Sequence, residues 1–173
     1  ALALALVLAP WLASLGGGKP PVLVSQTVVG DGFSHRADMA NFLLGPTGLT
    51  LGPDDTLYVT DGLDNEITAI EKATTRTTSA GKGRLVTKDG LLLWPLAMFM
   101  TPEGHLIVAN GKNGQAVEID PKADKQIYAH WLNANQAQSP PGNGNLFGIA
   151  LAPDGKSFYY VEDDINALRI AAP

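Results

Sequence analysis

A short phrase occurs three times in this chain, and this repetition constrains the fold more than any other feature. The copies read GLTLGPDDTLYVTD at 48–61, AMFMTPEGHLIVAN at 97–110 and GIALAPDGKSFYYVE at 148–162, so they start about fifty residues apart. A period of this size is the signature of a repeat architecture, in which each unit buries its faces only against its neighbours.

Each copy consists of two short apolar segments on either side of a tight turn. The turns are PDD at 53–55, PEG at 102–104 and PDG at 153–155. Proline pre-sets φ for the first turn position, and Gly or Asp tolerates the left-handed conformation that follows. The pattern therefore predicts a β-hairpin in each copy. The paired strands are expected at 49–51 with 57–59, at 98–100 with 106–108, and at 149–151 with 158–161.

Further apolar segments extend each hairpin. A third strand is predicted at 66–70, 116–119 and 166–170, and a fourth at 84–87 and 126–131. Helical repeats would need apolar residues at a period of 3.6, and none is visible. Four antiparallel strands in about fifty residues are typical of a propeller blade, whose faces pack on the neighbouring blades. The sequence predicts an all-β protein, a β-propeller of four-stranded blades.

The first copy, with its surroundings, resembles an NHL-type repeat. The resemblance rests on PTGLTLGPDDTLYVTD at 46–61 followed by Asn65 and Ile67, with looser copies at 95–119 and 146–170. It implies a six-bladed propeller, distantly similar to the gluconolactonase-like propellers. Such propellers include binding scaffolds, lyases and lactonases, so the resemblance implies a fold rather than one function.

The repeat also predicts how the chain is divided. We expect blades at 45–93, 94–145 and 146–173, and strands of a preceding blade within 1–44. Propellers have about four to eight blades, so three copies do not close a ring. We therefore expect a partial ring of three to four blades from a six-bladed protein, with further N-terminal blades upstream. A closed four-bladed ring completed by 1–44 is the alternative.

The first fifteen residues, ALALALVLAPWLASL, form the one long apolar run. A membrane-spanning helix is disfavoured because it needs about twenty apolar residues and because Pro10 interrupts the run. The core of a signal peptide fits the length, but no basic segment precedes it. A buried β-strand fits the strict alternation of Ala and Leu.

Composition excludes several functions. The net charge is -5, the pI is near 5.0, and the twelve Lys and Arg residues are scattered, so nucleic acid is not an expected partner. The chain has no cysteine, hence no disulfide, thiolate metal site or Cys nucleophile. We expect no membrane span. Propellers that this chain resembles are often exported, which implies a periplasmic or extracellular location.

Candidate binding residues follow from the geometry of a propeller. The loops between the second and third strands, and those leading into the first strand, lie on one face around the central channel, held by rigid strands. A further polar cluster, SHRAD at 34–38, could lie in such a loop, or form a surface turn with an ion pair between Arg36 and Asp38. The expected ligand-binding residues are Asp61, Asp64, Asn110, Asn113, Glu162, Asp163, His35, Arg36, Trp94 and Asn145.

Three of these residues are also an alternative metal site. Asp61, Asn110 and Glu162 occupy the same place in the three copies, and their oxygens could hold Ca²⁺. Such an ion could polarise an ester or lactone carbonyl and activate water. The competing interpretation is that Asp or Asn at a strand end hydrogen-bonds the following turn.

The resemblance to lactonases weakens at the start of the first strand. Lactonase relatives carry an Asn just before the Gly-Leu of that strand, whereas Thr47, Leu96 and Phe147 stand at this position here. The sequence thus predicts a binding scaffold for a small molecule or partner protein, without a cofactor. The alternative is a metal-dependent lactonase or lyase that uses Ca²⁺.

Overall fold

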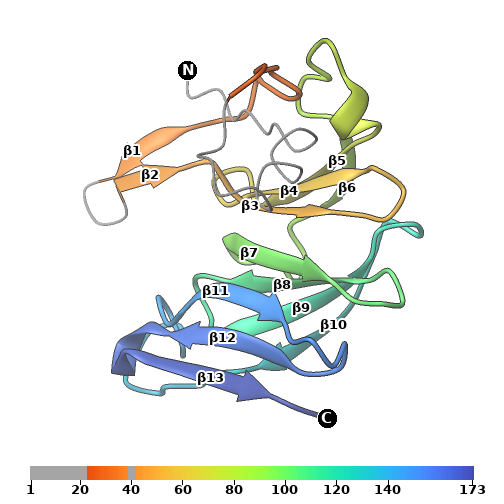
Figure 1. Cartoon of the computed structure of the whole chain (residues 1–173). Helices are drawn as coiled ribbons and strands as arrows, with labels where there is room; N and C mark the ends of the chain where they lie inside the picture. Colours follow the sequence, from red (N-terminus) through yellow and green to blue (C-terminus); the bar gives the residue numbers. More distant parts are fainter. Residues whose placement is uncertain (1–22, 39–41) are drawn as a thin grey trace.

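The computed structural model describes residues 23–38 and 42–173, and the regular secondary structure of this part is almost entirely β-strand (Figure 1). Its strands are β1 (Arg36–Asp38), β2 (Phe42–Leu44), β3 (Pro46–Leu51), β4 (Leu57–Asp61), β5 (Glu66–Ile70), β6 (Arg84–Lys88), β7 (Pro95–Met100), β8 (Leu106–Asn110), β9 (Gln115–Asp120), β10 (Lys125–Trp131), β11 (Leu146–Leu151), β12 (Phe158–Glu162) and β13 (Ala167–Ala171). Two single 3₁₀ turns, η1 (Ala73–Thr75) and η2 (Asp163–Ile165), complete the elements.

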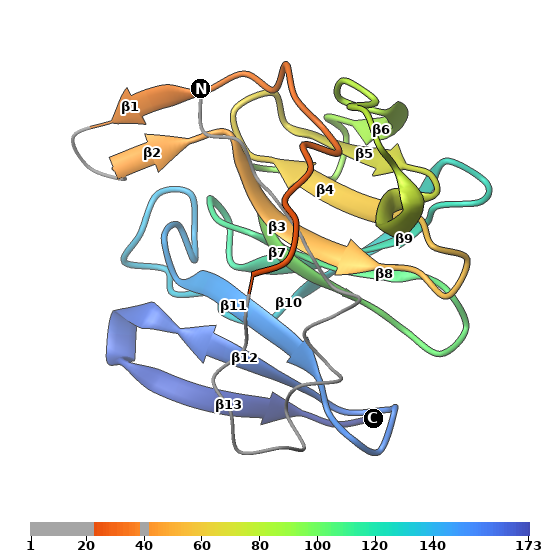
Figure 2. The same cartoon turned by 45° about the horizontal axis from the view of Figure 1, so that its top comes forward.

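The strands form successive antiparallel sheets. Strands β3 to β6 make one four-stranded sheet, β7 to β10 a second, and β11 to β13 a three-stranded third, while β1 and β2 pair as a separate ribbon. The first strands β3, β7 and β11 lie side by side, and each sheet continues outward from them (Figures 1 and 2). This arrangement confirms a β-propeller of four-stranded blades. The described residues make an arc of blades, which is the predicted partial ring.

Blade interfaces bury alternate residues of each strand, as period-two alternation requires. On β4, Tyr58 faces the second blade and joins a cluster that includes Ile67, Leu106 and Val117. Between the second and third blades, the ring of Phe99 lies 5.5 Å from that of Phe158. Full burial of one such side chain stabilises by about 1.5–3 kcal/mol, so the interfaces supply the core that no single blade has.

Local sequence chemistry sets the hairpins. Asp55, Gly104 and Gly155 adopt φ values of 65°, 90° and 68° in the three β-turns, which confirms the predicted left-handed positions. The predicted strands at 66–70 and 84–87 correspond to β5 and β6, and those at 116–119 and 126–131 to β9 and β10. Tight turns and strand alternation are local properties, and for this reason the sequence located them well.

The segment before β1 packs on the face of the first blade that points away from the second blade. Val29 joins a buried cluster with Leu57, Val59 and Ile70. The backbone N–H of Ala80 donates to the carbonyl of Val29 over 3.0 Å, so the loop between β5 and β6 is bound to this segment.

The N-terminal predictions have different outcomes. Residues 34–38 were predicted to form a loop or a surface turn. The prediction is wrong at 36–38, because these residues form β1, in which Arg36 pairs with Leu44 of β2. The apolar run of the first fifteen residues lies outside the described part of the chain. Among the described residues, no helix has the length and apolar character needed to cross a membrane.

Candidate functional site at the loop ends of the blades

One end of the blades carries most of the predicted site residues. The second strand of each blade finishes there, opposite the start of the first strand: Asp61 pairs with Pro46, Asn110 with Pro95, and Glu162 with Leu146. We call this end the loop face; it consists of 61–66, 89–95, 110–115, 131–145 and 162–167.

Asp61 is fully buried at the end of β4. Its Oδ1 accepts hydrogen bonds from the backbone N–H groups of Leu63 (2.9 Å) and Asp64 (3.1 Å). Its Oδ2 is buried and has no hydrogen-bond partner among the described residues. Burial raises the pKa of this carboxyl group, more than the two hydrogen bonds lower it. The strand-end interpretation therefore accounts for one oxygen of Asp61 and leaves the other free to bind.

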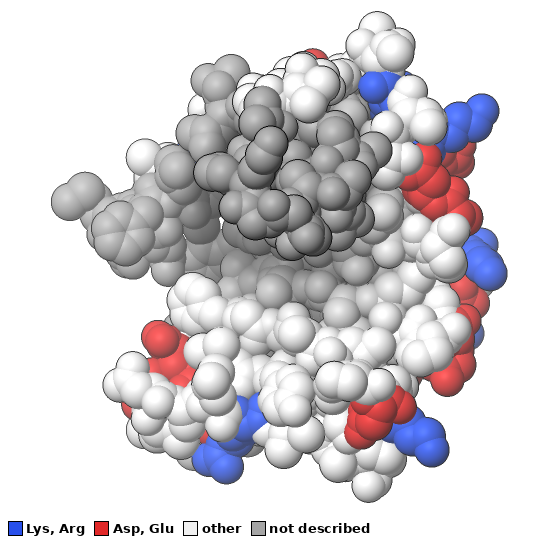
Figure 3. All heavy atoms as spheres, viewed as in Figure 1, with Lys and Arg blue, Asp and Glu red and all other residues white. Residues whose placement is uncertain are grey.

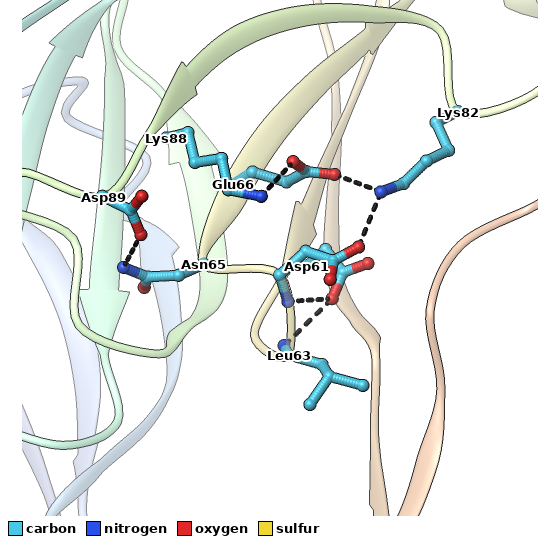
Figure 4. A network of polar contacts seen from close by, with 8 residues as sticks. Asp61, Leu63, Asn65, Glu66, Lys82, Lys88 and Asp89 are labelled. Carbon is cyan, nitrogen blue, oxygen red and sulfur yellow. Dashed lines mark hydrogen bonds and ion pairs between the residues drawn. The ribbon is translucent and has the colours of Figure 1, made fainter.

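Asp61 belongs to a group of three acids at this end of the first blade. Asp61, Asp64 and Glu66 each place a carboxylate oxygen within 4.8 Å of the others. The Nζ of Lys82 lies 2.7 Å from Asp64 Oδ2 and 2.5 Å from Glu66 Oε1. Figure 4 shows the side chains of Lys82 and Glu66 pointing toward each other. Lys88 approaches the other oxygen of Glu66 at 3.3 Å. Oxygen donors at this spacing can bind a hard cation such as Ca²⁺.

Electrostatics joins Lys82 to this group. The hydrogen bond from Lys82, supported by the hydroxyl of Ser34, lowers the pKa of Asp64. Burial lowers the pKa of Lys82, but its contacts with Asp64 and Glu66 outweigh burial and the pKa is raised overall. The ammonium thus stays charged at neutral pH and forms ion pairs with two of the three acids.

The other two members of the predicted metal set have different roles. Asn110 is fully buried; its Oδ1 accepts from the N–H of Leu93 (3.0 Å) and its Nδ2 donates to the carbonyl of Leu91 (2.9 Å). The Asn110 side chain therefore holds the loop between β6 and β7 in place, and does not bind the turn that follows Asn110 in the sequence. Glu162 accepts from Asn133 Nδ2 over 2.6 Å and pairs with Arg169.

The acids with metal-ligand spacing consequently lie within one blade. Among the described His, Asp and Glu residues, the group found includes Asp61 but not Glu162. The sequence had predicted metal ligands that come from three different blades.

Trp94 leads into β7 in a left-handed conformation with φ of 61°. Its backbone N–H donates to Asn65 Oδ1 over 2.9 Å, and the Nζ of Lys112 lies 4.1 Å from the ring centroid. The indole Nε1 is buried without a partner among the described residues. A Cβ at Gly62 would lie 2.3 Å from Trp94 Cδ1, so only glycine fits beside the ring.

A network of amides and acids surrounds Asn145 before β11. Asn145 is buried; its Oδ1 accepts from Gln138 Nε2 (2.5 Å) and its Nδ2 donates to Asp164 Oδ2 (3.1 Å). Asn133 and Asn135 also donate to Asp164, at 3.2 and 2.9 Å. Sequence analysis missed all of these residues except Asn145, although the amide-rich run NANQAQ at 133–138 was a signal.

The remaining predicted residues lie at the margins of the loop face. Among the described residues, the side chain of Asn113 bonds only to Gln115, accepting from its backbone N–H at 3.2 Å and donating to its side chain at 2.8 Å. Asp163 is exposed at the start of η2. His35 is exposed beside Gly45, where an added Cβ would lie 3.5 Å from His35 Cα. On the face drawn in Figure 3, basic side chains lie singly or beside acidic ones.

Comparisons with known proteins support the fold. No protein-family model and no curated protein sequence matches the chain. Among solved structures it resembles a gluconolactonase from Xanthomonas campestris, at 19% identity and a TM-score of 0.54 over 90% of this chain and 47% of that one. It also resembles the calcium-binding protein regucalcin from Agrobacterium tumefaciens (17%, TM-score 0.52, 69% of this chain and 40% of that one). Virginiamycin B lyase from Staphylococcus aureus is similar at 15% (TM-score 0.52, 82% and 48%).

These likenesses place the chain in the class of β-propellers. They agree with the expected distant similarity to gluconolactonase-like propellers and leave the NHL type and the six blades as predictions. The chain spans less than half the length of each of the three structures.

Proposed function

We propose that this chain is a binding scaffold whose loop face takes up a small polar molecule. The observation that carries the proposal is the position of unpaired buried atoms. Among the described residues, four buried side-chain atoms lack a hydrogen-bond partner, and three of them, Asp61 Oδ2, Trp94 Nε1 and Gln138 Oε1, belong to the loop face. Buried polar atoms are nearly always paired, and leaving one unpaired costs about 1–3 kcal/mol.

The chemistry of these atoms suggests the ligand. Asp61 Oδ2 and Gln138 Oε1 are hydrogen-bond acceptors, and Trp94 Nε1 is a hydrogen-bond donor. A hydroxylated molecule, such as a sugar derivative or a polyol, offers both donors and acceptors at short spacing. A loop of a partner protein could offer the same groups, but the burial of all three atoms favours a small molecule.

A second candidate is a metal-dependent lactonase or lyase with Ca²⁺ as cofactor. It is favoured by the three acids around Asp61 and by the names of the similar structures, a gluconolactonase and a lyase. A bound ion would supply Lewis acidity toward a carbonyl group. Against this candidate, Thr47 hydrogen-bonds the carbonyl of Pro95 at 3.0 Å and Phe147 is exposed, so neither position supplies a charged ligand.

The proposal includes the wider setting of the chain. We propose a six-bladed NHL-type ring, completed by blades upstream, in a periplasmic or extracellular location. The short span relative to the similar structures supports the longer protein.

The test is a ligand screen with matched variants. The full chain is screened by saturation-transfer NMR against polyols, sugar acids and sugar lactones. Trp94→Phe keeps an aromatic side chain but removes the N–H donor, and should weaken binding about tenfold, the effect of one lost hydrogen bond. Thr68→Val is the control, because Thr68 carries the fourth unpaired atom and lies within β5. Equal affinity of wild type and Trp94→Phe, or no binding of any of these compounds, contradicts the scaffold.

The enzyme candidate has a separate test. The chain is assayed for lactone hydrolysis with added Ca²⁺, and the three acids are changed one at a time in Asp61→Asn, Asp64→Asn and Glu66→Gln. Unchanged hydrolysis and unchanged metal content in all three variants would remove this candidate.

A further inference from the structure

The hairpin between β4 and β5 holds its three acids in a fixed arrangement. Asp61 and Glu66 are directly opposite each other on the two strands, so their Cβ atoms are about 4.5–5.5 Å apart. Asn65 closes the turn at φ of 54°, and its Nδ2 donates to Asp89 Oδ1 and to the carbonyl of Leu92, each at 3.1 Å. The acids are therefore held close together by the backbone itself and not by flexible side chains alone.

Such an arrangement has an electrostatic cost that the described partners only partly offset. Like charges at this separation repel, and each carboxylate is stabilised only by an opposite charge or by hydrogen bonds. Lys82 bonds to Asp64 and Glu66. Asp61 has none of its side chain exposed, and its Oδ2 has no partner among the described residues. This buried free oxygen is an observation separate from the spacing of the acids, and a carboxylate oxygen without a partner can bind a cation as well as a hydroxyl donor.

We propose that Asp61, Asp64 and Glu66 bind a divalent cation of the Ca²⁺ class, and that Lys82 competes with this cation for Asp64 and Glu66. Ca²⁺ takes six to eight oxygen ligands in flexible geometry, from carboxylates in one- or two-oxygen mode, carbonyls and water. Mg²⁺ requires a near-ideal octahedron and should bind more weakly to ligands fixed by a hairpin.

The position of Lys82 explains how competition works. Its Nζ contacts the same two carboxylates that a cation would use. A doubly charged ion gains more than the ammonium from three carboxylates at similar distances, since Coulomb energy scales with charge. Lys82 therefore sets the affinity, and bound Ca²⁺ displaces its side chain. The inference goes beyond the proposed function, because an ion inside one blade is compatible with a scaffold and with an enzyme.

The experiment is a calorimetric titration of the chelator-washed full chain with CaCl₂ and, separately, MgCl₂. Wild type should bind one Ca²⁺, and Mg²⁺ more weakly. Lys82→Met should tighten Ca²⁺ binding about tenfold to a hundredfold, because the ion then no longer has to displace the charged hydrogen bonds that Lys82 donates. Asp61→Asn should weaken it at least about tenfold.

Two control variants make the same substitutions, Lys to Met and Asp to Asn, at positions away from the three acids. Lys125→Met removes an exposed lysine of β10, and Asp154→Asn changes an aspartate that also accepts backbone hydrogen bonds in a turn. Neither should alter Ca²⁺ affinity. Unchanged affinity in Lys82→Met, or wild-type affinity in Asp61→Asn, would overturn the proposal. So would the absence of Ca²⁺ binding in both wild type and Lys82→Met.

Two further measurements keep the result interpretable. If circular dichroism shows that Asp61→Asn does not fold, Asp64→Asn is the second ligand variant, because Asp64 is only partly buried. Asp64→Asn should also weaken Ca²⁺ binding. Wild-type affinity in this variant counts against the proposal. The scaffold is tested through Trp94→Phe and an organic ligand, without added metal. Failure of that test with intact Ca²⁺ binding would remove the proposed function and leave this inference standing.

Discussion

Replacement of Asn110 by Ala tests whether a residue at a predicted site position is instead a structural fastener. Asn110 is fully buried, and its side chain pairs with the N–H of Leu93 and the carbonyl of Leu91. Ala removes two hydrogen bonds and leaves these backbone groups without a side-chain partner. Stranding a buried polar group costs about 1–3 kcal/mol, so we expect a loss of about 2–5 kcal/mol in the free energy of unfolding.

The assay is urea unfolding followed by tryptophan fluorescence, with thermal unfolding as a second measure. In a chain of this size about 1 kcal/mol shifts Tm by about 2–4 °C, so a loss of about 2–5 kcal/mol in Asn110→Ala should lower Tm by about 4–20 °C. Asn113→Ala is the matched control, because Asn113 bonds only to Gln115 in its own turn and should cost under about 1 kcal/mol. Equal and small losses in both variants would refute the reasoning and return Asn110 to the candidate ligands.

Three further outcomes follow from the same structure. Gly62→Ala should cost about 1–3 kcal/mol in the unfolding free energy, because its Cβ would clash with the fixed indole of Trp94; a blue or red shift in tryptophan emission without destabilisation would contradict the clash. The backbone N–H of Lys156 and the hydroxyl and N–H of Ser157 donate to Asp154, and these hydrogen bonds lower the pKa of its carboxyl group. Asp154 therefore stabilises the fold above its unfolded pKa, and this effect is lost as pH falls through the lower folded pKa; Asp154→Asn should flatten the acid limb of a plot of Tm against pH. Phe99→Ala should cost about 3–5 kcal/mol in urea unfolding, since its ring joins two blades, and a loss under about 1 kcal/mol would deny that interface a role.

Sequence analysis found the site residues that belong to the repeat and missed those brought in by the loops. Asp61, Asn110 and Glu162 were found because they occupy one register of a repeated hairpin. Lys82 was missed: it lies 18 residues from Asp64 along the chain and reaches it only because the loop after β5 turns back toward the segment before β1. No local pattern encodes such a path, since it depends on which face of the blade the loop covers.

The network in the third blade shows the same limit. Asn133 and Asp164 are 31 residues apart and meet only when the loop before β11 folds against the turn after β12. Amide side chains carry no periodic signal, so their partners become visible only in three dimensions.

The sequence by itself determined the all-β architecture, the turn positions of the three hairpins and the strand bounds of the three repeat copies to within a few residues. These features depend on period-two alternation and on residues such as Asp55 and Gly104 that accept left-handed turns, and both are written locally in the chain. Only the tertiary structure decided that Asn110 holds the loop before β7, that the acids gather within one blade, and that Lys82 forms ion pairs with two of them. The physical reason is that hydrogen-bond partners and charges across loops depend on distances through space, which the folded backbone alone fixes.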